Sequence, residues 1–321
     1  MERAEGPAFI GPPAAVPMPS SSVAVPLAPP SDALAARLAD FKELLKPGIT
    51  VFVTVMAAAG YVLAADGPLD WSVMAGLALG TALTAGGGAA LNHVVERKYD
   101  ALMPRTARRP VAAKRLSPLV SAVYGLACVA LGAVALALTT NALTTLLAVL
   151  TVVLYVAVYT PLKRVTVLNT LVGAVPGALP ALGGAAAATG VLDATGWSLF
   201  AVLFLWQLPH FFALAWMYRD DYRAGGFKML PSGRGGEQTM ARIVLVSTLM
   251  LLVAGVLPAV VGQAGLVFLG GMALLGTAFT LPAFSFYAEP NDLRARRLLL
   301  ASIAYVPAFF VLVVLDFLVR A

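Results

Sequence analysis

Three side chains suited to binding a metal ion recur at a spacing of four residues: Asn92, Glu96 and Asp100. On an α-helix this spacing places one amide and two carboxylates along a single face, where the acids repel each other unless a cation lies between them. Hard cations such as Mg²⁺ prefer these oxygen ligands and usually bridge to substrate phosphates. Basic residues that could bind the phosphates follow directly, at Arg105 and Arg109. The segment therefore predicts diphosphate chemistry.

A second acidic cluster, Asp220 and Asp221, follows a different apolar stretch. Neighbouring residues on a helix point about 100° apart, so these two carboxylates cannot face the same way. We expect one of them to bind metal and the other to cap the helix or form an ion pair. Tyr222 and Lys228 lie beside them and could contact phosphate. With the first cluster, this pattern predicts two metal sites around one diphosphate.

Four further polar residues lie at or within apolar stretches. Lys163 and Arg164 suit a diphosphate clamp as well as an ordinary basic loop, and Asn169 could contact the same cavity. His210 is an ionisable residue inside a predicted span, where such residues are usually functional. The alternative for His210 is a neutral side chain bonded to a carbonyl at a turn disrupted by proline. His93 turns away from the face of the first cluster and is not expected to be a ligand.

The composition indicates a helical membrane protein. Of the 321 residues, 60% are hydrophobic and 12% are charged, with a mean hydropathy of +0.86. A soluble domain averages about 25% charged residues. The net charge of +6 does not indicate a nucleic-acid partner here, because the basic residues are concentrated between apolar stretches. The single cysteine, Cys128, excludes an intramolecular disulfide.

Nine apolar stretches are each near the ~20 residues that cross a bilayer as a helix. The sequence therefore predicts an all-α polytopic bundle. We expect residues 1–31, which are rich in proline and alanine, to be a disordered tail, and residues 32–48 to form an interfacial amphipathic helix. Residues 49–321 would form the transmembrane domain, with spans at 49–65, 71–91, 118–138, 141–160, 169–190, 196–215, 241–262, 265–287 and 298–319.

The basic residues predict the orientation. Of the 22 lysines and arginines, 21 fall before the first span or at the ends and loops on the same side of the bundle, and Arg320 falls on the other side. Under the positive-inside rule, the N-terminus is cytoplasmic and the C-terminus lies across the membrane. Both acidic clusters then lie on the cytoplasmic side.

These motifs resemble those of the UbiA-type intramembrane prenyltransferases, and in particular their haem O synthase branch. The resemblance covers about residues 45–320 and rests on four stretches. They are Asn92-x-x-x-Glu96-x-x-x-Asp100 with Met103-x-Arg105-Thr106-x-x-Arg109-Pro110, then Tyr159-Thr-Pro-Leu-Lys-Arg164, Asn169-Thr-x-x-Gly-x-x-Pro-Gly-Ala-x-Pro180, and Trp206-Gln-x-Pro-His-Phe211 continuing to Tyr218-Arg-Asp-Asp-Tyr222.

The resemblance implies a nine-helix bundle around a cavity open to lipid. Farnesyl diphosphate would bind there with Mg²⁺ and react with the 2-vinyl group of haem b, and water addition would give haem O, as an end product or a precursor of haem A. The first cluster, with Asp220 or Asp221, would hold the metal. Diphosphate would be bound by Arg105, Arg109, Lys163, Arg164 and Lys228, with Tyr222 and Asn169 as further contacts. His210 would contact haem through its iron or a propionate.

The same resemblance implies a multi-pass protein of the bacterial inner membrane. Haem A synthase or oxidase-assembly proteins would be its partners, and no nucleic acid would be involved.

Three alternative functions stand beside the transfer of a farnesyl group to haem. A related prenyltransferase could act on a quinone precursor or a chlorophyllide. A transporter usually places ionisable residues at the bilayer midplane, and a haem chaperone has no need of two acidic clusters.

Overall fold

The computed structural model describes residues 30–320, and from Leu38 on these form one compact unit. Residues 1–29 of the predicted disordered tail lie outside the described part of the chain. Pro30 and Ser31 already belong to the first helix, α1 (Pro30–Leu44). The last residue of this helix, Leu44, is buried in a cluster with Ala90, Val111 and Leu116. The C-terminal end of α1 therefore packs against α3 and the segment that follows α3.

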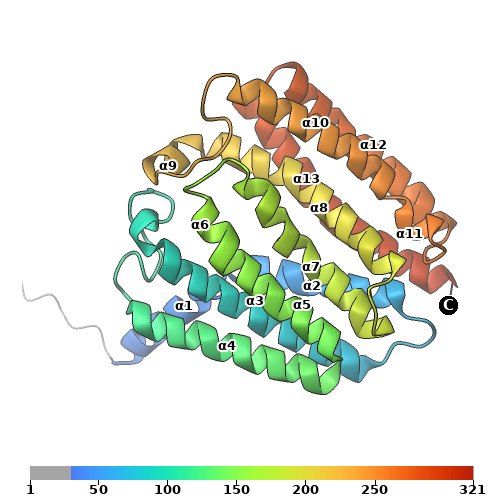
Figure 1. Cartoon of the computed structure of the whole chain (residues 1–321), viewed down its shortest axis with the longest axis horizontal. Coiled ribbons are helices and arrows are strands. Elements are labelled where there is room, and N and C mark those ends of the chain that lie inside the picture. Colours follow the sequence, from blue (N-terminus) through green and yellow to red (C-terminus); the bar gives the residue numbers. More distant parts are fainter. Residues whose placement is uncertain (1–29, 321) are drawn as a thin grey trace, which may run out of the picture. The chain divides into compact units, whose positions relative to one another are not determined.

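Every regular element among residues 30–320 is helical (Figure 1). After α1 come α2 (Pro47–Ala64), α3 (Trp71–Asp100), α4 (Pro118–Thr139), α5 (Ala142–Val153), the π-helix η1 (Leu154–Tyr159), α6 (Thr160–Leu162), α7 (Asn169–Thr189), α8 (Ala194–Met217), α9 (Arg219–Ala224), α10 (Gly236–Ala254), α11 (Leu257–Val260), α12 (Leu266–Ala288) and α13 (Asp292–Arg320).

Nine helical segments in the described range are long and apolar enough to cross a membrane, which confirms the predicted all-α membrane fold. Their ends carry recognisable sequence signals. Asp70 accepts hydrogen bonds from the backbone at the start of α3, while Ser117, Asn141 and Asp193 do the same for α4, α5 and α8. Such caps satisfy amide groups that the first helical turn leaves free.

Small residues allow helices α2 and α7 to pack backbone against backbone. A Cβ atom added at Gly60 would collide with the carbonyl of Ala181, and one at Gly184 would collide with the carbonyl of Ala57. The helix α7 remains continuous although Pro176 and Pro180 lie inside it. Close approach of this kind is typical of membrane helices, whose interfaces favour small side chains.

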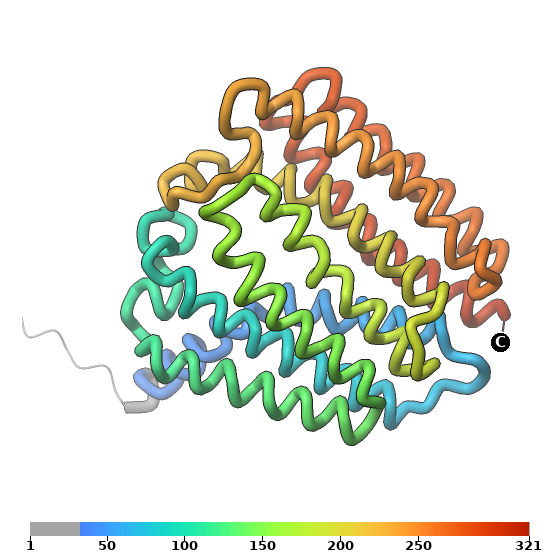
Figure 2. Tube along the Cα trace, viewed as in Figure 1, coloured from blue at the N-terminus to red at the C-terminus, as the bar shows by residue number. Residues whose placement is uncertain are grey.

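The segments that carry the predicted functional residues gather at one end of the unit. Figure 2 shows the chain returning to this end after α3, after α6 and again at α9. Helix α3 continues nine residues past the predicted end of its span at 91 and reaches Asp100. The first acidic cluster therefore lies on regular helix rather than on a loop, and rigid backbone positions it.

Candidate active site

The first acidic cluster is buried on α3. Asn92, Glu96 and Asp100 expose 0%, 4% and 1% of their surface. Asn92 and Glu96 contact the two ends of α6, since the Asn92 amide donates to Thr160 at 3.0 Å and Glu96 accepts from Nζ of Lys163 at 2.7 Å. Burying charged carboxylates is costly unless they are paired, so basic partners are required here.

Three basic residues surround these acids. Nη1 of Arg109 donates to both oxygens of Asp100, at 2.8 and 2.9 Å, and lies 3.9 Å from Glu96. Lys163 binds Glu96, and Nζ of Lys46 donates to Oδ1 of Asn92 at 2.7 Å. The sequence predicted Arg109 and Lys163 as phosphate ligands, and the structure brings both to the acids of α3.

Sequence reasoning missed Lys46. This residue precedes α2 in the left-handed region, with φ of 47°, which a residue with a side chain rarely adopts. Burial, together with the positive charges of Arg109 and Lys163, lowers the pKa of Lys46 to about 7. Its position before Pro47-Gly48 was a possible signal, but a lysine at a membrane boundary is normally explained by lipid headgroups.

A π-helical turn shapes the wall opposite α3. Helix α5 widens into η1, where the rings of Tyr155 and Tyr159 stack with centroids 5.9 Å apart. Nζ of Lys163 lies 4.6 Å from the centroid of Tyr159. Burial alone would lower the pKa of Lys163, but Tyr159 and Glu96 outweigh it, so that its pKa is raised. Single π-helical turns such as η1 are frequent at functional sites.

The second acidic cluster lies on the short helix α9, and its two acids diverge. Asp221 is 21% exposed and lies 3.7 Å from Nε of Arg105. Asp220 is 77% exposed and pairs with Arg223 at 2.9 Å. The guanidinium of Arg105 also lies 4.6 Å from the Tyr218 ring centroid and 5.9 Å from that of Tyr222. The structure therefore directs Asp221, rather than Asp220, toward a residue of the predicted phosphate set.

This difference gives a prediction with an internal control. Asp221→Asn should lower kcat/KM for a diphosphate substrate, which the sequence predicts, by about 10²-fold or more, as expected for a group that stabilises transition-state charge. Asp220→Asn should change it less than threefold, since exposed ion pairs contribute little. Steady-state assays of the two purified variants check this. Equal losses in both variants would contradict the assignment.

Three other predicted residues hold the loops of the site together. The Lys228 backbone N–H donates to the Lys163 carbonyl at 2.7 Å, and the Asn169 amide donates to the Lys228 carbonyl at 2.8 Å. The Arg164 guanidinium lies 4.0 Å from the Tyr99 ring centroid. The side-chain amide of Asn169 is thus bonded to backbone, which favours a positioning role over direct contact with substrate.

Among residues 30–320, no group of three or more histidine, cysteine, aspartate or glutamate side chains lies close enough to hold a metal ion by itself. The acids of α3 and α9 nevertheless fit a metal ion bound partly by a substrate. Mg²⁺ is commonly held by one or two carboxylates and by phosphate oxygens. Glu96 and Asp100 supply two carboxylates, Asn92 an amide oxygen, and Asp221 a further carboxylate on the other wall.

His210 has a defined hydrogen-bond partner on another helix. Its Nδ1 lies 2.9 Å from Oγ of Ser302 on α13. That hydroxyl donates its proton to the carbonyl of Leu299 at 2.6 Å, so toward His210 it must accept. Nδ1 therefore carries the proton, as assigned from this network, and Nε2 keeps a free electron pair. The helix α8 continues through Pro209, so the alternative of a histidine at a turn disrupted by proline does not hold.

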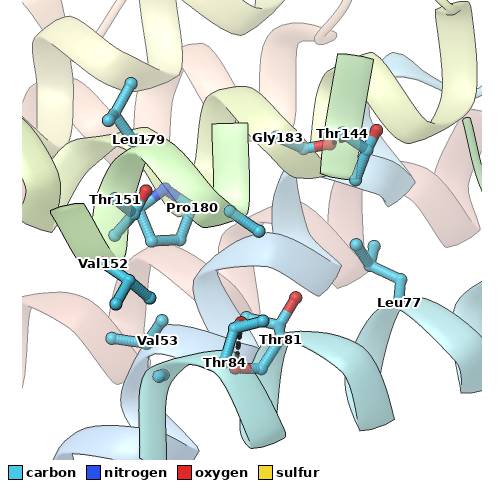
Figure 3. A pocket seen from close by; sticks show the side chains of 12 residues that line it. Val53, Leu77, Thr81, Thr84, Thr144, Thr151, Val152, Leu179, Pro180 and Gly183 are labelled. Atoms are coloured by element: carbon cyan, nitrogen blue, oxygen red, sulfur yellow. Dashed lines mark hydrogen bonds between the residues drawn. The ribbon is translucent and has the colours of Figure 1, made fainter. Parts of the chain in front are cut away.

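An apolar cavity lies on the membrane side of the first cluster, between α2, α3, α5 and α7. In Figure 3, Thr81 and Thr84 of α3 face Leu179 and Pro180 of α7 across it. The cavity is narrow, about 30 Å³. Thr84 lies two turns before Asn92 on the same helix, about 12 Å at the roughly 1.5 Å rise per residue. A narrow apolar cavity therefore lies beside the proline-containing helix α7.

Comparison with known proteins gives a family match. The UbiA prenyltransferase family model matches residues 51–313. The chain is 45% identical to a protoheme IX farnesyltransferase of Salinibacter ruber, over 86% of this chain and 98% of that one. It is 37% identical to a protoheme IX farnesyltransferase of Solibacter usitatus, over 86% and 98%.

Solved structures share the fold. A UbiA homologue from Aeropyrum pernix has a TM-score of 0.67 at 21% identity, over 84% of this chain and 97% of that one. A UbiA homologue from Archaeoglobus fulgidus bound to GPP and Mg²⁺ has a TM-score of 0.63 at 14% identity, over 85% and 99%. At such identities the likeness establishes the arrangement of helices alone.

Proposed function

Because the chain belongs to the UbiA prenyltransferase family, we propose that it transfers the farnesyl group of farnesyl diphosphate to the 2-vinyl group of haem b. The protoheme IX farnesyltransferases among its relatives, matched over nearly their whole length, support haem as the acceptor. The observation that carries the proposal is the pair of buried acids, Glu96 and Asp100, bound by the half-buried Lys163 and Arg109. It combines ligands for a metal ion with ligands for phosphate.

The chain's own residues would stabilise the leaving diphosphate. Asn92, Glu96, Asp100 and Asp221 would hold Mg²⁺, which when bound neutralises charge on the diphosphate. Arg105, Arg109 and Lys163 would donate to the remaining phosphate oxygens, with Arg164, Lys228 and Tyr222 near the rim. The hydrogen bonds from these donors become stronger as the C–O bond breaks and negative charge builds on the leaving diphosphate. This lowers the activation barrier.

The reaction balances without an oxidant or a reductant. The C–O bond of farnesyl diphosphate breaks with its electron pair on the diphosphate. The vinyl group supplies the electron pair for the new C–C bond, which leaves a cation on the carbon next to the porphyrin ring. Water adds to that carbon and loses a proton, giving the hydroxyethylfarnesyl group of haem O. Apolar walls protect the first cation from water.

The cavity between α3 and α7 is the proposed path of the farnesyl chain. It lies inward of Asn92 along α3, and a farnesyl chain must widen it by side-chain movement because its volume is only about 30 Å³. Gly88 lies one turn before Asn92 on α3, between Asn92 and the lining residue Thr84. A Cβ atom added there would be 3.6 Å from Val152 and 3.7 Å from Tyr155, an ordinary contact distance.

Gly88 therefore provides a test of the path. Gly88→Phe should raise KM for farnesyl diphosphate about tenfold or more while affecting dimethylallyl diphosphate much less, because the ring would obstruct the chain beyond the first isoprene unit. Gly88→Ala, whose methyl group fits, is the control and should change both values less than threefold. Initial-rate assays with the two diphosphates check this. An unchanged preference in Gly88→Phe would rule out this path.

His210 is the proposed ligand of the haem iron. The sequence left two contacts open for His210, the haem iron and a propionate. We favour the iron, because Nε2 of neutral His210 has a free electron pair and no proton to donate to a carboxylate. Iron-binding histidines characteristically donate their other ring N–H to a fixed partner. Ser302 fills that position at 2.9 Å, and Trp206 stacks on the imidazole with centroids 5.2 Å apart.

The proposed setting is the bacterial inner membrane, with the N-terminus and the acidic clusters on the cytoplasmic side. The distribution of basic residues supports this orientation. Water-soluble diphosphate would then leave into the cytoplasm. Haem A synthase and oxidase-assembly proteins are the proposed partners, since they would use the product.

The acceptor is tested by offering each candidate compound separately. Membranes that contain the protein are incubated with labelled farnesyl diphosphate, Mg²⁺ and one acceptor: haem b, 4-hydroxybenzoate or chlorophyllide. We expect label to appear in haem alone. Label in either of the other acceptors would favour a related prenyltransferase, and no transfer to any of them would favour a transporter or a haem chaperone.

A further inference from the structure

One buried polar side chain on α3 has neither a role in the mechanism nor, within the described part of the chain, a hydrogen-bond partner. His93 is 2% exposed, and among residues 30–320 neither of its ring nitrogens has a hydrogen-bond partner. Burying a polar group without a partner is unfavourable, and such groups require a specific explanation. His93 follows Asn92 and so points about 100° away from the metal-binding face of α3. Its unmet hydrogen bonds therefore indicate a ligand other than the metal-bound diphosphate.

His93 lines an open cavity at the start of α2. The cavity has a volume of about 370 Å³ and is bounded by Glu43, Lys46, Pro47, Gly48, Ile49, His93 and Arg109. It adjoins the diphosphate site, because Lys46 bonds to Asn92 at 2.7 Å. Ile49, at its edge, is 59% exposed in a helix that is expected to cross the membrane. The cavity therefore opens at the boundary between bilayer and cytoplasm.

The charges around this cavity favour an anion. Lys46 and Arg109 are basic, and the contacts of Arg109 with Asp100 and Glu96 are made by Nη1. The acidic lining residue, Glu43, is already bound by Arg115 at 3.0 Å. The first turn of α2 also faces the cavity, and a helix N-terminus carries partial positive charge. Both ring nitrogens of His93 are shielded from solvent, so a rotation of its imidazole toward the cavity would add a histidine N–H to these donors.

We propose that this cavity binds a propionate of the haem acceptor, with His93 and Lys46 donating to the carboxylate; this rests on the proposed function. Haem carries both carboxylates on one edge and its vinyl groups away from that edge. A carboxylate held at the membrane boundary leaves the apolar ring in the bilayer. His210 cannot supply this contact, because its protonated nitrogen already donates to Ser302.

The backbone at Lys46 supports a functional contact. Lys46 has φ of 47°, and a similar conformation recurs at the exposed Lys114, with φ of 60°. Glycine adopts this region without strain. Lys46→Gly should therefore fold at least as well as the parent but bind haem b more weakly, by about fivefold or more. Lys114→Gly gains the same backbone freedom at a residue that does not line the cavity, and it should bind haem b as the parent does.

The decisive comparison uses purified full-length protein, haem b and its dimethyl ester, in which both carboxylates are blocked. For the parent, we expect KM for the ester to exceed KM for haem b about tenfold, as for the loss of a hydrogen bond to a charged group. His93→Leu should raise KM for haem b to a similar extent and change KM for the ester and for farnesyl diphosphate less than twofold. His93→Gln, which keeps a donor, should recover part of the affinity.

Three results would overturn the assignment. Equal KM values of the parent for haem b and its ester would show that the carboxylates are not bound. Equal effects of His93→Leu on both acceptors would make His93 a packing residue. A raised KM for farnesyl diphosphate alone would assign the cavity to phosphate. If the parent transferred no farnesyl group to haem b but did so to another acceptor, the proposed function itself would fail.

Discussion

Asp100→Asn should reduce farnesyl transfer by about 10²–10³-fold or more, the range for removing a group that stabilises transition-state charge. Asp100 is 1% exposed, and its two oxygens accept from Nη1 of Arg109 at 2.8 and 2.9 Å. Asparagine has nearly the same shape but carries no charge and has one oxygen in place of two. It can neither bind Mg²⁺ as a carboxylate does nor neutralise the positive charge of Arg109.

The same substitution should leave the protein inserted in the membrane. Arg109 keeps a second acid, Glu96, within 3.9 Å, and no apolar contact is removed. The matched control is Glu289→Gln, which removes a carboxylate that is 67% exposed and pairs with Arg294 at 2.7 Å. Turnover is measured with farnesyl diphosphate, Mg²⁺ and haem b. If Asp100→Asn kept the turnover of the control, the metal-site assignment would be wrong.

His210→Ala should abolish the axial ligation of haem and weaken haem binding strongly. Ser302→Ala should weaken it about 10–100-fold, the usual effect of removing the group that orients a metal-bound histidine. Ser302→Thr, which keeps the hydroxyl, should retain most of the affinity. The measurement is titration of purified protein with haem b, followed by the visible spectrum, which reports the iron ligands as well as the affinity.

A second buried serine serves as the control for this pair. Ser247 on α10 is 3% exposed and donates to the carbonyl of Ile243 at 2.7 Å. Ser247→Ala removes the same hydroxyl group without touching His210. Its haem spectrum should match that of the parent. Unchanged spectra in His210→Ala would exclude this histidine from haem binding, and equal effects of the two serine variants would make Ser302 a structural residue.

Local sequence patterns were sufficient for the fold and for the first acidic cluster. Apolar length predicted the membrane helices, and the spacing of four placed Asn92, Glu96 and Asp100 together on α3, because both depend on residues close in sequence. On α9, local geometry predicts that the neighbouring side chains Asp220 and Asp221 point in different directions, and they have different partners. Which of the two faces the site depends on Arg105, which lies far away in the sequence.

The features that escaped prediction depend on long-range contacts. Lys46 reaches Asn92 across 46 positions, and Ser302 reaches His210 across 92. Neither partner belongs to a pattern visible in the chain. His93 is not expected among the ligands of the α3 metal site, and its other surroundings could not be foreseen, because the cavity is formed by the start of α2 and by Arg109.

The most direct test of the account is the mass of the pigment after membranes that contain the protein are incubated with haem b, farnesyl diphosphate and Mg²⁺. We predict that haem b gains one farnesyl group and one hydroxyl group, and that in water labelled with heavy oxygen the label appears in the product. Haem recovered with its original mass, while farnesyl diphosphate is consumed on another acceptor, would contradict the central claim.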